Sequence, residues 1–249
     1  MSWCDKLASV PTAGFFLDWH FAPSNAILEA LAPTLDSMVS NEKPQFTVNA
    51  LDPFSTTIRT LDGFQYGVEP SKVSIGFSHS VKAKAVSGGP PVLEMLSHPL
   101  PYTELLGEVL AKLINVTVLV PGNRTRKVTK IGIVSSTQVD LDEAPPGIRR
   151  LIDYMGKPWK GLIESYSFQI AADLDRTAAS HDRCIHTITR PEDPHELLGM
   201  VFDWQRELTP GRPINRDVLL ELTKRAKADA LSYFENLAEG ERFDVHHDS

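Results

Sequence analysis

The chain has 249 residues, 42% of them hydrophobic and 23% charged, so it is long enough to bury one large core or two smaller ones. Its formal net charge of −7 argues against a sequence-independent grip on nucleic acid or anionic membranes, since such binding needs clustered lysine and arginine. The two cysteines, Cys4 and Cys184, lie far apart and form no spacing motif. We therefore expect reduced thiols rather than a secreted disulfide framework.

The N-terminal residues do not resemble a signal peptide, because only Lys6 precedes the first apolar run and Asp18 soon interrupts it. No stretch of the sequence is long and apolar enough to predict a transmembrane helix. The sequence therefore predicts a soluble, cytoplasmic protein that does not associate with a membrane.

The first third of the chain predicts a strand, a helix and an antiparallel meander. Residues 14–21 alternate between two faces, which is typical of a half-buried strand, and Ser24 can cap a helix that Pro33 kinks or ends. Four short strands are predicted next, at residues 45–51, 56–61, 64–67 and 72–78. The Asp62-Gly63 pair is a hairpin signal between the second and the third of these.

The middle of the chain is predicted to contain a long exposed loop at residues 80–100, since it includes a Gly-Gly-Pro-Pro run at 88–91. An amphipathic helix follows at residues 102–114. Two strands, at residues 116–120 and 127–135, are expected to form a hairpin around Pro121, Gly122 and Asn123. The acidic, proline-bearing stretch at 140–147 is the best candidate boundary between two halves.

The last third predicts a short helix at residues 148–155 and strands at 162–174, 183–190 and 197–204. After a loop with prolines, a helix of roughly 23 residues begins near Asn215. Its apolar positions recur every three or four residues: Leu219, Leu222, Ala226, Ala230, Tyr233, Phe234 and Leu237. We expect this helix to cover the sheet.

Groups of strands separated by helices indicate an α+β fold with largely antiparallel sheets and a long C-terminal helix packed on the sheet. We expect two halves, residues 1–140 and 141–249, either as separate units or as one continuous domain. The runs Phe16 to Trp19 and Val201 to Trp204 are alike, and each precedes a predicted helix. This likeness raises the hypothesis of an internal duplication, although the spacings within the two halves differ.

Two places in the chain resemble a family of uncharacterised prokaryotic proteins of about this length that is distributed sporadically among genomes. They are the helix at 102–114 with the strand at 128–134, and the strand ending at Phe202 and Asp203 with its terminal helix. The resemblance implies a prokaryotic α+β protein and brings no catalytic residues with it. By analogy, a setting in antiviral defence would suit a sporadic family.

The densest set of chemically capable side chains lies at residues 181–186. On a strand, Cys184 and His186 point to the same face and could share a metal ion. Zinc would need two further ligands, and the sequence offers no second close pair, only His98, His195 and Asp203. We predict no metal site and interpret the segment as a partly exposed strand with a buried cysteine, keeping Cys184 and His186 as the alternative ligands.

Three pairs of aspartates could perform acid–base or two-metal chemistry: Asp173 with Asp175, Asp140 with Asp142, and Asp18 with Asp203. Aspartates that cap helices or face solvent at strand ends explain them equally well. The sequence contains no nucleophile elbow and no glycine-rich phosphate loop. We therefore predict no catalytic residues and no cofactor.

A basic cluster contrasts with the acidic background: Arg124, Arg126, Lys127 and Lys130, with Arg149 and Arg150 further along. At the tip of the predicted hairpin it would be exposed and could bind a protein partner or nucleic acid, and a solvated hairpin is the alternative. Because no aromatic residues are interleaved with it, stacking on bases is not expected.

Because catalytic signatures are absent, we expect a non-catalytic protein-interaction subunit or adaptor of a larger assembly, which binds a protein partner or associates with itself. Two alternatives stay open. The first is a nucleic-acid-binding subunit with ferredoxin-like halves, which the basic hairpin favours. The second is a metal-dependent hydrolase that uses the cluster at residues 181–186.

Overall fold

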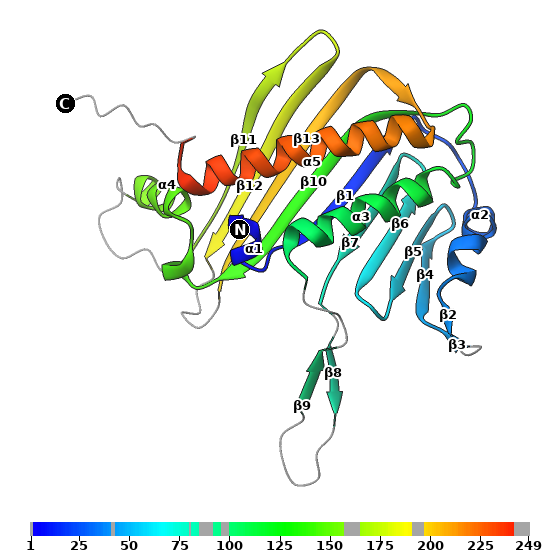
Figure 1. Ribbon diagram of the computed structural model, residues 1–249, viewed down its shortest axis with the longest axis horizontal. Helices are drawn as coiled ribbons and strands as arrows, with labels where there is room; N and C mark the ends of the chain where they lie inside the picture. Colours follow the sequence, from blue (N-terminus) through cyan, green and yellow to red (C-terminus); the bar gives the residue numbers. More distant parts are fainter. Residues whose placement is uncertain are drawn as a thin grey trace.

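An antiparallel sheet of nine strands organises the protein (Figure 1). The computed structural model describes residues 2–40, 43–79, 81–84, 92–95, 100–156, 165–190 and 197–241. From one edge of the sheet to the other the strands are β11 (Tyr166–Arg176), β12 (Ser180–Arg190), β13 (Leu198–Pro213), β10 (Lys127–Val139), β1 (Val10–Leu17), β7 (Lys72–Phe77), β6 (Phe64–Glu69), β5 (Ser55–Thr60) and β4 (Phe46–Asp52).

The described helices are α1 (Trp3–Lys6), α2 (Ser24–Asp36), α3 (Tyr102–Thr117), α4 (Pro146–Gly156) and α5 (Arg216–Glu239), with a 3-10 turn at Leu141–Glu143. Two strand pairs lie outside the main sheet: β2 (Val39–Ser40) with β3 (Lys43–Pro44), and β8 (Val81–Lys84) with β9 (Val92–Met95). The long helices α3 and α5 lie side by side on one face of the sheet, α3 on β1 and β7, and α5 on β10 and β13 (Figure 1). The predicted α+β fold with its C-terminal helix packed on the sheet is confirmed.

The core lies between the sheet and these helices, because successive strand residues point to opposite faces. In β7, Val73, Ile75 and Phe77 are buried on the helix side, as the period of two in the sequence predicts. The same alternation buries Ile131 and Ile133 of β10. One continuous cluster of buried side chains therefore spans the sheet.

Helix α5 begins and ends where its sequence predicts. The side chain of Asn215 accepts a hydrogen bond from the backbone nitrogen of Val218 at 3.0 Å, which satisfies one of the free donors of the first turn. Gly240 ends the helix with a φ of 86°, a conformation that favours glycine. All the predicted apolar positions are buried except Leu222, which is half-buried.

An ion-pair network fixes α5 to the strands beneath it. The guanidinium group of Arg206, on β13, donates to both carboxylate oxygens of Asp182 at 2.7 and 2.5 Å and to Asp229 of α5 at 2.8 Å. Asp182 lies on β12, so one arginine joins two strands and the helix. Bidentate geometry and partial burial make such a pair stronger than an exposed one.

The opposite face of the sheet, called the open face below, has no helix against it in the described part of the chain (Figure 1). Its described side chains are half-buried or exposed, apart from Gln205 at 8% exposure. Threonine, serine and glycine predominate there, with charged and a few apolar residues between them. An antiparallel sheet can face water on one side in this way.

The predicted strand at residues 116–120 is wrong. Helix α3 continues to Thr117, and the chain then turns towards β10, so the predicted hairpin does not exist. Val116 and Thr117 complete the buried face of α3 that begins at Tyr102, and the Thr117 hydroxyl donates to the carbonyl of Leu113 at 2.7 Å. Burial against the sheet thus outweighs the strand preference of the β-branched residues in this segment.

Two predicted loops contain strands. Strand β13 does not end near Trp204 but continues to Pro213, since β10 pairs with it as far as Lys127 opposite Pro213. Beyond Leu208 the other side of β13 has no partner on β12, so the prolines remove no ladder bond there. Within the predicted loop at 80–100, β8 and β9 pair with each other, and the Gly-Gly-Pro-Pro run lies outside the described residues.

Candidate functional site

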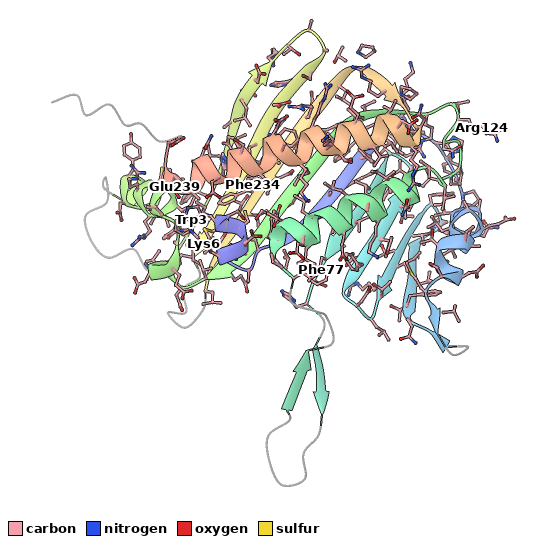
Figure 2. The ribbon with its side chains drawn as sticks, in the orientation of Figure 1. Trp3, Lys6, Phe77, Arg124, Phe234 and Glu239 are labelled. Carbon is pink, nitrogen blue, oxygen red and sulfur yellow. The ribbon has the colours of Figure 1, made fainter. Side chains whose placement is uncertain are left out.

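The four basic residues predicted to bind a partner do not form one exposed cluster. Arg124 and Lys127 are exposed at one end of the sheet, and Figure 2 shows Arg124 pointing away from the protein in the loop that follows α3. Arg126 lies between them but is buried at 6% exposure. Lys130 lies on the open face, beside the strand β1.

The guanidinium group of Arg126 donates hydrogen bonds to backbone carbonyls of two distant segments. Its Nε donates to the carbonyl of Asp18 at 2.9 Å and its Nη2 to that of Pro70 at 2.6 Å. Burial lowers the pKa of the guanidinium, and the nearby Asp18 opposes this effect. The expectation of an exposed side chain is therefore wrong for Arg126, which holds the loops after β1 and β6 against the start of β10.

Two exposed aromatic side chains lie at the same end of the sheet. Strand β1 ends at Leu17, so Trp19 and Phe21 lie beyond it with 69% and 58% of their surface exposed, not on a strand as predicted. Asp18 ties this segment to β10, because its carboxylate accepts from the backbone nitrogen of Lys127 at 3.1 Å. The fold thus brings exposed aromatic rings near exposed cations that the sequence keeps apart.

The open face holds, on the middle strand β1 and its neighbours, a group that we call the central cluster: Phe16, Lys72, Lys130, Asp203 and Gln205. Phe16 of β1 has Lys72 of β7 opposite it on one side and Lys130 of β10 on the other. The two ammonium nitrogens lie 5.4 and 3.9 Å from the centre of its ring. Both distances are within the range of cation–π attraction.

Asp203 is the half-buried carboxylate of the central cluster. It accepts a hydrogen bond from Nε2 of Gln205 at 2.6 Å, and the other amide atom of Gln205 accepts from Lys130 at 3.3 Å. Burial raises the pKa of Asp203, while Gln205 and the cations Lys130, Lys72 and Arg183 act to lower it. A polar network therefore runs from the carboxylate to the ammonium group that lies over Phe16.

Sequence reasoning missed the central cluster as a group. It singled out Asp203 and Lys130 separately and did not single out Phe16 or Gln205. The signal was present in the alternation of β1, which places Phe16 on the face opposite Phe15. What the sequence could not supply was the strand order that sets β7 and β10 on either side of β1.

Among the hollows on the described surface, two adjoin the sheet. One, of about 170 Å³, lies on the open face and is lined by Thr12, Gln65, Gly67, Ser74, Gly76, Phe77 and Ser78. A Cβ atom at Gly67 would lie only 2.8 Å from Oγ of Ser74. The absence of a side chain at Gly67 therefore leaves room for the Ser74 hydroxyl. The other, of about 580 Å³, lies between the end of α2 and α3 beside Tyr66 and Lys112.

Cys184 and His186 share a face of β12, as predicted, but this face is the core side under α5. Cys184 has no exposed surface and His186 has 3%. Nε2 of His186 lies 2.8 Å from the hydroxyl of Tyr233, and burial raises the pKa of the Cys184 thiol. Among the described residues, no three histidine, cysteine, aspartate or glutamate side chains are placed to hold a metal ion.

The predicted aspartate pairs differ in their surroundings. Asp18 and Asp203 do not meet, because Asp18 lies beside Lys127 and Asp203 pairs with Val134, about 23 Å further along β10. Asp173 is exposed and lies 3.2 Å from Nε2 of His181. The third pair, Asp140 and Asp142, is exposed around the 3-10 turn.

Within the described residues, no helix is long and apolar enough to cross a membrane. The sequence matches no family model, and comparisons with curated proteins and with solved structures found no match either.

Proposed function

We propose that the protein is a non-catalytic interaction subunit or adaptor, which binds a protein partner through the open face of its sheet. The observation that carries this proposal is the central cluster. An aromatic ring flanked by two cations, next to a half-buried carboxylate, lies near the end of the middle strand on a sheet face that no described helix covers. Aromatic side chains are enriched in protein interfaces, and charged side chains on complementary surfaces fix the register and specificity of binding.

The chemistry of the open face also supports binding rather than catalysis. The central cluster offers a single carboxylate, Asp203, held by an amide and cations, and the hollow on the same face is lined by hydroxyl, amide and apolar groups. These groups suit polar contacts with another surface. The larger assembly, its prokaryotic setting and a role in defence stay predictions, as does the family resemblance.

Nucleic acid is the second candidate partner. Phe16 between Lys72 and Lys130 combines an aromatic ring that could stack on a base with cations that could bind phosphate, on an open antiparallel sheet. Other proteins use this combination to recognise single-stranded RNA. Trp19 adds an exposed ring at the end of the same strand. Acidic neighbours such as Asp203 and Glu207 on the same face, and the net charge of −7, favour the protein partner.

The decisive experiment compares three tagged chains purified from their native cells: wild type, Lys72→Glu/Lys130→Glu, and a control. The control, Lys224→Glu/Arg216→Glu, makes the same change in charge at exposed sites on α5. We expect a stoichiometric protein with the wild type and the control but not with the open-face variant. If all three retain the same proteins, the open face is not the interaction surface.

The same purification separates the two partners. If the copurified component is lost after nuclease treatment, the partner is nucleic acid. In that case a labelled single-stranded oligonucleotide should bind with an affinity that falls steeply as salt rises and that Phe16→Ala weakens. A protein that stays bound after nuclease treatment supports the adaptor.

The metal-dependent hydrolase has less support. Its candidate ligands lie in the core, where His186 is hydrogen-bonded to Tyr233 and Cys184 is covered. A catalytic metal needs an open position for water or substrate. Neither side chain faces one of the hollows described above.

We also infer that the sheet consists of two related halves. β1 is followed by α2, a meander that returns to pair β7 with β1, and then α3. β10 is followed by α4, a meander that returns to pair β13 with β10, and then α5. This repeated order supports a division before β10 rather than at residue 140. The similar runs at Phe16 and Val201 lie on β1 and β13, which are not corresponding strands in it.

A further inference from the structure

Strand β11 leaves one long edge of the sheet without a neighbour in the described part of the chain. Natural proteins usually protect such edges with charges, prolines or bulges, because the free N–H and C=O groups can pair with another strand. β11 pairs regularly with β12 from Tyr166 to Asp173, and Asp173 is its first charged residue. The other outer strand, β4, is regular only from Phe46 to Asn49 before its register breaks.

We propose that two copies of the chain join edge to edge through antiparallel pairing of β11 with β11, about a two-fold axis between Gln169 and Ala171. The regular run of each copy would then overlap that of the other. About eight backbone hydrogen bonds would form between the copies. The arrangement is isologous and closes as a dimer.

The side chains of β11 complement a second copy of themselves. All its charges lie at one end: Asp173, Asp175 and Arg176. Antiparallel pairing sets this end of each copy against the uncharged start of the other, around Tyr166 to Phe168, so no like charges lie opposite one another. Like charges in that position would destabilise the pair. A parallel arrangement would instead set Asp173 beside Asp173.

The apolar residues of β11 are also arranged for a second copy. Tyr166, Phe168 and Ile170 share the helix side of the strand and are half-buried, with rings 5.9 Å apart for the first two. In the dimer this row would continue into the same row of the other copy. Its exposed apolar edge would then be removed from water. Main-chain pairing with apolar contacts on alternate residues is a known mode of strand addition.

The dimer uses the edge of the sheet and leaves the open face uncovered. The two proposals therefore fail separately: variants of β11 should change the oligomeric state, and variants of Lys72 and Lys130 should not.

The test places like charges at the edge and then restores attraction. In Gln169→Lys/Ala171→Lys, two exposed residues near the axis become cations that face cations of the second copy. We expect a dimer for the wild type by light scattering at tens of micromolar, and a dimer dissociation constant raised on the order of tenfold or more in the variant. The control, Gln65→Lys/Gln138→Lys, adds the same charge at exposed glutamines of the open face and should stay dimeric.

The decisive experiment mixes variants of opposite charge. The lysine variant and Gln169→Glu/Ala171→Glu should each be mainly monomeric, with unchanged far-ultraviolet circular dichroism, and should form a one-to-one dimer when mixed. A wild type that is monomeric at tens of micromolar overturns the proposal. So does a lysine variant that stays dimeric, or a mixture of the two variants that stays monomeric.

Discussion

Nε2 of His186 and the hydroxyl oxygen of Tyr233 lie 2.8 Å apart beneath α5, with their rings stacked 5.7 Å from centre to centre. The imidazole ring of His186 also makes a hydrogen bond with the backbone of Ile170. A neutral imidazole donates through one nitrogen and accepts through the other, so the nitrogen facing the backbone carbonyl donates and Nε2 accepts the tyrosine proton. With these hydrogen bonds the pair joins β12 to α5 in the neutral form of His186, which is the form that burial favours.

Acid should therefore destabilise the protein through His186. Burial lowers the pKa of His186 to about 4, whereas an unfolded histidine titrates near 6.5. Between these values the unfolded state binds the extra proton, so stability is full above about pH 6.5 and falls as the pH falls towards 4. From pH 7 to pH 4.5 this group should remove about 2 to 3 kcal/mol of unfolding free energy, measured by urea titration.

The comparison that isolates His186 uses two variants. His186→Leu should lose less stability than the wild type over the same pH interval, because carboxylates titrate in both proteins. His181→Ala, at a half-buried histidine beside Asp173, should keep the wild-type loss. An equal loss in the wild type and His186→Leu would contradict the assignment.

The packing of α5 can be tested with two adjacent leucines. Leu219 has no exposed surface, while 48% of Leu220 is exposed. Leu219→Ala should cost about 2 to 5 kcal/mol of unfolding free energy, the range for a buried leucine. Leu220→Ala should change it by less than about 0.5 kcal/mol. Similar small effects at both positions in urea denaturation would mean that α5 is not held against the sheet in solution.

The sequence predicted those elements whose pattern is local. Val73, Ile75 and Phe77 show the period of two that β7 needs, and the stripe from Leu219 to Leu237 shows the helical period of α5. The pairings of β1 with β7 and β10, and of β10 with β13, could not be predicted, because each joins segments far apart in the chain. These pairings decide which face stays open and which residues meet there.

Arg126 shows the same limit at a single residue. Its neighbours, Gly122 and Asn123, predict an exposed turn. Its burial depends on carbonyls of Asp18 and Pro70, which are 108 and 56 positions away in the sequence. Composition near a residue therefore says little about a contact that the tertiary fold creates.

Arg126 and Arg124 should accordingly differ when each is replaced by alanine. Arg126→Ala leaves two part-buried carbonyls without their charged donor and should cost about 1.5 to 3 kcal/mol of unfolding free energy. Arg124→Ala removes an exposed charge and should change it by less than about 0.5 kcal/mol. Thermal or urea denaturation measures both, and equal effects would show that the Arg126 contacts do not form in solution.

Asp203 should destabilise the protein at neutral pH. Burial raises the pKa of this carboxyl in the folded state above its unfolded value, which means that folding penalises the ionised form despite Gln205 and Lys130. The folded state then binds more protons just above the unfolded pKa, so this group lowers stability as the pH rises through that window.

Asp203→Asn keeps an acceptor for Gln205 and removes the charge. It should raise the urea midpoint at pH 7, and the difference from the wild type should shrink as the pH falls and the wild-type carboxyl takes up its proton. Asp173→Asn, at an exposed aspartate of β11, is the matched control and should not raise the midpoint. A lower midpoint for Asp203→Asn at pH 7 would mean that the attraction of Lys72, Lys130 and Arg183 outweighs the cost of burial, and that the carboxylate holds the central cluster together.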